Sequence, residues 1–411
     1  MNFRRSAAAL AAAAVIGVVA TPVAQAADPS PSATPSVAIP SGLYGSGDPT
    51  YDGVWRQSLA LLAQDAVGVR PAGQAVDWLT GQQCANGAFA SFRADTATAC
   101  DAKTMLDTNA TSAAVQALAA LGGHDAVTGK AVGWLKSVQN KDGGWGFGAG
   151  SPSDANSTSI VIGALAAVGE KPAEVRKGGK SPFDALLGLA LPCDEKDGGA
   201  FAYQPDKKGE LAANADATAA GVLGALGKGL DAEAGEKAAA SKCADAKTPE
   251  QAAANGAAYL AGAVAKDGHL VSALPGAEDQ PDFGNTADAV VALAAQGGAE
   301  RAAKPLKWLE ENSAGWAKQS GPAAYAQLIF AALATGTDPR DFGGTDLVEQ
   351  LNATGPAPQA AGKDESKQDE AADKADAGDD DNAMWWVIGA LFVGGIGIGF
   401  LLSGRKKGRQ A

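Results

Sequence analysis

Hydrophobic and polar positions recur in blocks along the middle of the chain. Each block contains an amphipathic stretch with an aromatic residue, a glycine-containing turn, a polar triplet, and a second stretch rich in Ala, Val and Leu. The stretch at 130–138 and its turn at 141–145 show the pattern most fully, and weaker copies lie on both sides of it. Because such periodicity is the signature of a repeat architecture, the pattern predicts a series of helical pairs.

The polar triplets mark where the second helix of each pair begins. They read Asp107-x-Asn109-x-Thr111, Asp154-x-Asn156-x-Thr158, Asn214-x-Asp216-x-Thr218 and Asp282-x-Gly284-x-Thr286. Side chains of these types accept hydrogen bonds from the unpaired amides of a first helical turn. The stretches that follow are apolar nearly all round, which is typical of buried helices, and glycines end them. Each repeat is therefore predicted to pair an outer amphipathic helix with a buried inner helix.

The number of these helices predicts the fold class. A first apolar helix at 52–66, four full pairs, a fifth pair at 299–311 and 322–334, and a last helix near 345–352 make six pairs. Pairing of the last helix with the first would close the stack and remove its exposed ends. We therefore expect an all-α fold, an α/α toroid of about six helical hairpins, with an open superhelix as the alternative.

The two ends of the chain have compositions that differ from the repeats. Arg4 and Arg5, an apolar stretch and Ala24-Gln25-Ala26 are typical of a secretory signal peptide. Segments rich in Pro and Ser, or in Asp, Glu and Ala, flank the repeats and cannot bury enough apolar surface to fold. The predicted organisation is a signal peptide (1–26), a flexible spacer (27–48), the repeat domain (49–354), a disordered acidic stalk (355–383), a transmembrane helix (384–403) and a basic tail (404–411).

The predicted transmembrane helix sets the expected location of the protein. Residues 384–403 carry no charge and are long enough to cross about 30 Å of hydrocarbon as a helix. Arg405, Lys406, Lys407 and Arg409 follow, which indicates a cytoplasmic tail and an extracellular repeat domain. We therefore expect a cell-surface protein that is exported and anchored in the plasma membrane.

Charge and cysteine content narrow the classes of function. The net charge is −13 and no basic stripe occurs, so nucleic-acid binding is not expected. The four cysteines, Cys84, Cys100, Cys193 and Cys243, lie in the exported part, where disulfides form. Of the three pairings, Cys84–Cys100 with Cys193–Cys243 is favoured, because each bond then closes a loop within one repeat. A zinc site is not expected, since the chain has no Cys-x-x-Cys and only two histidines.

The most complete repeat resembles a known motif. Lys130, Ala131, Trp134, Leu135, Gln139, Gly143 and Trp145 fit the QW repeat of the terpene cyclase and protein prenyltransferase superfamily. The copy at 74–89 fits as well, with Gln74 in place of the basic residue and Phe89 in place of the Trp. The resemblance covers most of residues 50–340 and implies the α/α toroid. It also implies that Trp78, Phe89, Trp134 and Trp145 belong to the core.

The resemblance can be tested branch by branch for function. The repeats lack the Asp-x-Asp-Asp acid of class II terpene cyclases, the Asp, Cys and His zinc ligands of prenyltransferases, and the Gly-Cys-x-Glu-Gln of thioester proteins. The secreted, disulfide-bonded cobalamin carriers are a further branch, although the small β domain that they carry has no counterpart among the segments here. This branch makes cobalamin a candidate ligand, and no cofactor is otherwise implied.

Two groups of residues are candidates for ligand binding. Residues of the triplets could face one mouth of the ring, where helix N-termini favour polar or anionic groups, although capping alone would explain them. Aromatic residues outside the repeat pattern, or in place of a triplet Thr, could line a pocket. The candidates are Tyr51, Trp55, Asp107, Asn109, Asp154, Asn156, Asp216, Asp282 and Tyr325.

These observations lead to one functional hypothesis and two alternatives. The hypothesis is a membrane-anchored extracellular toroid that captures a corrinoid or an amphipathic small molecule, with a membrane transporter as its partner. The first alternative is a surface glycan hydrolase or lyase that uses paired carboxylates, or a degenerate terpene cyclase or prenyltransferase-like enzyme. The second alternative is a structural adhesion module. No catalytic residue and no metal ligand is assigned.

Overall fold

The computed structural model describes residues 38–238, 242–272 and 279–360, and this part of the chain is mostly helical. Among these residues, two sets of six helices alternate along the sequence. The inner helices are α1 (Gly53–Ala66), α3 (Thr108–Leu121), α5 (Ala155–Ala167), α7 (Ala215–Ala225), α9 (Phe283–Gly297) and α12 (Pro322–Thr335). The outer helices are α2 (Gly73–Gly81), α4 (Asp125–Ser137), α6 (Pro182–Leu187), α8 (Pro249–Ala263), α10 (Ala303–Asn312) and α13 (Leu347–Asn352). The predicted all-α fold is confirmed.

Short elements complete the described part. They are the helices η1 (Pro172–Glu174), η2 (Ala299–Ala302) and α11 (Ala314–Ser320), and the strands β1 (Leu270–Ser272) and β2 (Gln280–Asp282). The two strands form an antiparallel pair in which Leu270 lies opposite Asp282. This small hairpin replaces the plain turn that leads into an inner helix elsewhere in the repeats.

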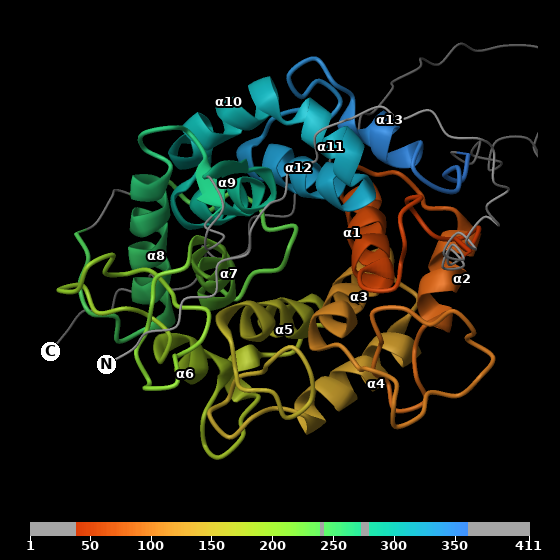
Figure 1. The fold of residues 1–411 in the computed structure, drawn as a ribbon, viewed down its shortest axis with the longest axis horizontal. Helices are drawn as coiled ribbons and strands as arrows, with labels where there is room; N and C mark the ends of the chain where they lie inside the picture. Colours follow the sequence, from red (N-terminus) through yellow and green to blue (C-terminus); the bar gives the residue numbers. More distant parts are fainter. Residues whose placement is uncertain (1–37, 239–241, 273–278, 361–411) are drawn as a thin grey trace, which may run out of the picture. The chain divides into compact units, whose positions relative to one another are not determined.

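The inner helices form a closed ring, surrounded by the outer helices (Figure 1). Each inner helix packs against the next one along the chain, and α12 packs back against α1. Small residues permit this close packing. A Cβ atom on Gly224 of α7, for example, would lie only 2.7 Å from the Cβ atom of Ser159 of α5. The Ala- and Gly-rich composition that predicts inner helices is therefore a steric requirement of the ring.

A buried threonine connects each of four inner helices to the turn before it. The Oγ of Thr158 accepts a hydrogen bond from the backbone N–H of Trp145 at 3.1 Å, and that of Thr218 accepts one from Phe201 at 2.9 Å. The equivalent pairs are Thr111 with Phe89 and Thr286 with Leu270. All four threonine side chains are fully buried. The third residue of each triplet therefore fixes the preceding turn.

The residues that carry the QW resemblance have structural roles. The Gln139 side-chain amide donates to the carbonyl oxygens of Gly143 at 2.8 Å and Val175 at 3.2 Å, which joins the turn to the next repeat. The Trp145 indole is buried and donates to the carbonyl of Leu135 at 2.7 Å. Their assignment to the core and the turns agrees with these contacts.

The two ends of the described chain meet beside α1. Tyr44 is fully buried, and its hydroxyl lies 3.1 Å from Gln64 Oε1 and 3.2 Å from the carbonyl oxygen of Pro356. The side-chain amide of Gln359 donates to the carbonyl of Pro71 at 2.9 Å. Residues 38–48 and 355–360, which their composition places in the spacer and the stalk, therefore contact the helices, because one buried Tyr anchors both segments.

Both favoured disulfides are present. Cys84 bonds to Cys100 and Cys193 bonds to Cys243, with Cα–Cα distances of 5.7 and 5.6 Å.

Within the described ranges no helix combines the length and the apolar character needed to cross a bilayer. The predicted signal peptide, transmembrane helix and basic tail lie outside those ranges and stay predictions.

We expect Thr218→Val to destabilise the protein by about 1–3 kcal/mol, because it leaves the buried N–H of Phe201 without an acceptor. Urea denaturation followed by circular dichroism measures this change. The exposed Thr96 provides the control, and Thr96→Val should change the free energy of unfolding little. Equal effects of the two substitutions would contradict the role given to the threonine.

The two disulfides should contribute unequally. Loop-closure entropy assigns about 3 kcal/mol to the Cys84–Cys100 bond, with a separation of 16 residues, and about 4 kcal/mol to the Cys193–Cys243 bond, with a separation of 50. Replacing each pair by Ser and comparing the urea midpoints tests this order. A larger loss from the Cys84→Ser, Cys100→Ser variant would show that local contacts outweigh loop entropy.

Candidate functional site

The inner helices enclose a cavity of about 360 Å³, to which every one of them contributes side chains. Lining residues recur three, four or seven positions apart, as with Asn109 and Gln116 of α3 or Asp216, Ala220 and Leu223 of α7. This spacing defines one face of a helix. The cavity is therefore built by the inward face of each inner helix.

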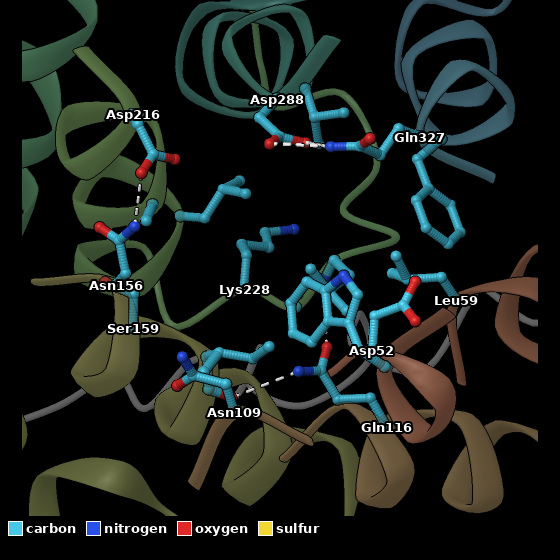
Figure 2. A pocket seen from close by; sticks show the side chains of 18 of the residues that line it. Asp52, Leu59, Asn109, Gln116, Asn156, Ser159, Asp216, Lys228, Asp288 and Gln327 are labelled. Carbon is cyan, nitrogen blue, oxygen red and sulfur yellow. Dashed lines mark hydrogen bonds between the residues drawn. The ribbon is translucent and has the colours of Figure 1, made fainter. Parts of the chain in front are cut away.

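One end of the cavity is polar. Asn156 and Asp216 each occupy the second position of their helix, α5 and α7, and their side chains are joined by a 2.6 Å hydrogen bond from Asn156 Nδ2 to Asp216 Oδ2. This contact shows that the two helices begin at the same end of the ring. Figure 2 shows these two side chains together on one side of the cavity. The middle residues of the triplets thus line the polar end.

A second amide–carboxylate contact lies on the neighbouring wall. Gln327 of α12 donates from Nε2 to both carboxylate oxygens of Asp288 of α9, at 3.1 Å each (Figure 2). Three buried oxygen atoms of the lining have no hydrogen-bond partner among the described residues: Asn109 Oδ1, Asn156 Oδ1 and Ser159 Oγ. The polar end therefore contains buried acceptors that the protein itself leaves unpaired.

Burial and mutual repulsion alter the acidity of the lining carboxyl groups. Burial, together with the charges of Asp216 and Asp282, raises the pKa of Asp288 from 3.8 to about 7, against the opposing hydrogen bond from Gln327. Burial also raises the pKa of Asp216, although the hydrogen bond from Asn156 opposes it. At neutral pH, Asp288 is thus poised between its protonated and ionised forms.

The opposite end of the cavity has a larger share of apolar side chains, although Gln116 and Lys228 also line it, and it is covered. Leu59, Leu223 and Phe330 belong to its lining, and the segment after α7 runs across it. Leu230 of this segment donates its backbone N–H to Gln116 Oε1 of α3 at 2.9 Å, and Gly235 donates to the carbonyl of Ala294 of α9 at 3.0 Å. Because α3 and α9 are not neighbours in the ring, the segment spans it and closes this end.

The open end carries exposed aromatic side chains. Tyr51, just before α1, is 85% exposed, and Phe147, in the loop before α5, is 45% exposed, and both line the cavity. They form a rim through which a molecule would enter.

The structure brings most, but not all, of the candidate residues together. Tyr51, Trp55, Asp107, Asn109, Asn156 and Asp216 line the cavity. Asp154, Asp282 and Tyr325 are not among the lining residues.

Each of these three residues has another position or role. Asp154 is fully buried and caps α5 by accepting from the N–H and the hydroxyl of Ser157, and Asp282 caps α9 through the N–H of Asn285. Tyr325 of α12 is 5% exposed and packs in the hydrophobic core of the domain.

Several lining residues are not among the candidates that the sequence suggests. Asp288 lies one helical turn after Gly284, inside the Ala- and Val-rich stretch of α9, and Gln327 holds a similar place in α12. A polar side chain in such a helix is the signal that could have identified them. Asp52, Gln116, Ser159 and Lys228 also line the cavity. Among the residues that the structure describes, no group of three or more His, Cys, Asp or Glu side chains is arranged to hold a metal ion.

Comparisons with known proteins give only distant likenesses. No protein-family model matches the chain, and no curated protein matches it. Similar solved structures include an ent-copalyl diphosphate synthase from Streptomyces platensis, with 16% identity, a TM-score of 0.44, and coverage of 69% of this chain and 50% of the synthase. The chain therefore spans half the length of that enzyme.

Two further solved structures resemble the chain at a similar distance. A sugar epimerase from a ruminal bacterium has 14% identity and a TM-score of 0.49, over 72% of this chain and 93% of the epimerase. A protein from Actinoplanes has 18% identity and a TM-score of 0.31, over 68% of this chain and all of that one. Likenesses at this level assign no activity, so the function is argued from the cavity alone.

The raised pKa of Asp288 predicts a pH dependence of stability. The folded protein binds this proton more tightly than the unfolded chain does, so the free energy of unfolding should fall as the pH rises from about 4 to about 7. Asp288→Asn should remove this loss, which is at most about 4 kcal/mol. The measurement is urea denaturation of both proteins at pH 4, 5.5 and 8.

Asp95 provides a control of opposite sign. Hydrogen bonds from Thr98 and Ala97 lower the pKa of this exposed residue. Asp95→Asn should therefore lower the stability at pH 8, whereas Asp288→Asn should raise it. If Asp288→Asn left the pH profile unchanged, Asp288 would not be the group that titrates.

Proposed function

We propose that the protein binds a small amphipathic molecule in the cavity of its helical ring. The observation that carries this proposal is the polarity of the cavity. Unpaired acceptors and two carboxylates lie at its open end, and apolar side chains lie at its covered end. Ligand pockets combine an apolar lining with a few placed polar groups in this way.

The unpaired acceptors support a binding role over a purely structural one. A buried polar atom without a hydrogen bond costs about 1–3 kcal/mol, so native proteins retain few of them. Here Asn109 Oδ1, Asn156 Oδ1 and Ser159 Oγ all belong to residues that line one cavity. A ligand that donates hydrogen bonds would satisfy them, whereas a scaffold would gain nothing from leaving them unpaired.

The size of the cavity limits the ligand. Its volume of about 360 Å³ is near the lower end of the roughly 300–1,000 Å³ that pockets for drug-sized molecules span. A compact amphipathic molecule fits this space. A corrinoid, with a macrocycle and many substituents, would enter only in part, and its binding at the open rim can be tested directly.

We further propose that binding takes place outside the cell. The predicted signal peptide and transmembrane helix would hold the ring at the outer face of the plasma membrane, and the two disulfides suit an oxidising compartment. A ligand captured there would be delivered to a membrane partner such as a transporter.

One observation favours a second candidate, an enzyme acting on a glycan or a similar substrate. Asp288, whose pKa burial and the charge of Asp216 raise to about 7, could act as a general acid at neutral pH. Its electrostatic coupling to Asp216 is of the kind that divides the roles of two carboxyl groups. Turnover of an envelope glycan that is lost in Asp288→Asn would support this alternative.

A substitution that fills the cavity tests the proposal. Ala220 of α7 lines the cavity, and Ala220→Phe should weaken binding at least about tenfold by occupying ligand space. Thermal-shift screening of the purified, oxidised protein against cobalamin and a panel of small amines, alcohols and acids would identify ligands. Calorimetry would then compare the variants.

The exposed Ala126 of α4 provides the matched control, since Ala126→Phe adds the same side chain on the outer ring. Binding that survives Ala220→Phe as well as Ala126→Phe would place the ligand outside the cavity and contradict the proposal.

A further inference from the structure

We propose that the cavity selects an organic cation, with an ammonium head that donates hydrogen bonds and a compact apolar body. This inference rests on the proposed function, and it adds the chemical class of the ligand. It is carried by the charges of the lining, the orientation of two side-chain amides and the unpaired oxygen atoms at the open end.

The charge of the lining is uncompensated. Within the described part of the chain, four carboxyl groups line the cavity, and an ion pair compensates only Asp52, whereas the other three only accept hydrogen bonds. Asp52 pairs with Arg56 at 3.2 Å, and Asp107 accepts hydrogen bonds from the N–H groups of Asn109 and Ala110 at 2.8 and 2.9 Å. Asp216 and Asp288 form no ion pair among the described residues.

Lys228 is the basic residue of the described lining, but it does not neutralise these two carboxyl groups. Its side chain is exposed, and it lies on the segment that covers the apolar end of the cavity. Its charge is not a cause of the pKa shift of Asp216 or of Asp288. The carboxyl groups of Asp216 and Asp288, which line the same cavity, therefore have no cationic partner.

The amides on either side of the carboxylates are fixed in orientation. Asn156 directs its NH₂ group to Asp216, so its Oδ1 is left as a free acceptor, and Gln327 directs its NH₂ group to Asp288. Each amide therefore directs at least one N–H to a carboxylate. The unpaired Asn156 Oδ1 beside them is an acceptor, which a ligand with a donor group can satisfy.

A buried hydroxyl provides a second, independent observation. Ser159 of α5 lines the cavity, is only 4% exposed, and its Oγ has no partner among the described residues. Asn109 Oδ1 is unpaired in the same way. A primary ammonium group carries three N–H donors, which carboxylate and amide oxygens of this lining can accept.

The helix N-termini at this end do not favour an anion here. In four of these helices, one or two amides of the first turn already donate to Asp107, Asp154, Asn214 or Asp282. An anion would meet these capping groups and the carboxylates of Asp216 and Asp288. Helix N-termini can attract polar or anionic groups, but this cavity therefore disfavours an anionic ligand.

The rest of the lining suits an apolar body. Leu59, Leu223 and Phe330 line the cavity toward the covered end, and Trp55 lines it in the first turn of α1 (Figure 2 labels Leu59, Asp216 and Asp288). An aromatic face also attracts a cation, most strongly in the case of Trp. A neutral polyol would satisfy the acceptors, but it would leave the two carboxylates unneutralised and the apolar wall unused.

Calorimetric titration with three probes of one shape tests the inference. Phenethylamine is cationic at pH 8, 2-phenylethanol is neutral and phenylacetate is anionic. We expect the amine to bind at least about tenfold more tightly than the alcohol, and the acid not to bind. Asp216→Asn and Asp288→Asn should each weaken amine binding about tenfold or more, since each removes a charge-assisted hydrogen bond.

The matched control is Asp267→Asn, which makes the same change in an exposed turn and should leave amine affinity unaltered.

Amine binding should also weaken at pH 5, where Asp288 is protonated. The charged or titratable groups facing Asp288 are Asp216 of α7 and Asp282 at the start of α9, with Lys228 across the cavity. Because both variants remove a buried charge, they should fold, which a cooperative urea transition confirms.

The outcomes separate the inference from the proposed function. Equal binding of the amine and the alcohol, or amine binding that is unaffected in Asp216→Asn and Asp288→Asn, overturns the cation inference and leaves the proposed function standing. Failure of the amine, while other compounds bind in a manner sensitive to Ala220→Phe, likewise overturns only the cation inference. If no compound of any class binds, both the inference and the proposed function fail.

Discussion

The hydrogen bond between a buried threonine hydroxyl and the amide of the preceding turn is the contact on which the ring depends. It occurs at Thr111, Thr158, Thr218 and Thr286, which are all fully buried. Each bond joins the first turn of an inner helix to the turn that follows an outer helix. Separating the helix from the turn would leave a buried amide without an acceptor, which is energetically costly. The helix and the turn are therefore held together. The direction in which these four inner helices enter the ring is thereby fixed.

Because of this constraint, the three positions of each triplet have different structural roles. The first residue caps the helix and the third holds the turn, so only the middle residue is free to vary. The middle residues Asn109, Asn156 and Asp216 all line the cavity. The fourth middle residue is Gly284, where an added Cβ would lie 3.6 Å from the Gln327 amide. A Cβ at this distance would make an ordinary van der Waals contact with the amide, which binds Asp288 one turn further on.

The sequence predicts the scaffold better than the site, and the reason is physical. Helical pairs, caps and disulfides follow from local patterns. Which triplet residue faces the cavity depends on the ring, so in the sequence Asp154 and Asp282 look as suitable as Asn156, although both are caps. Tyr325 stands at the third position, which faces the core, and its aromatic character could not reveal this. The contact that closes the cavity joins residues 114 positions apart, beyond any local signal.

The separation between residues that hold the helices and residues that line the cavity explains how the fold tolerates two buried carboxyl groups without a cation. Burial of Asp216 and Asp288 without a cation opposes folding, but the threonine contacts and the Ala-rich packing hold their helices in place regardless. A ligand that relieves this charge would stabilise the folded ring by mass action, because it binds only the folded form. With the far end covered by the segment at 228–235, such a ligand would enter and leave past Tyr51 and Phe147. A partner that receives the ligand would therefore have to approach this same end of the ring.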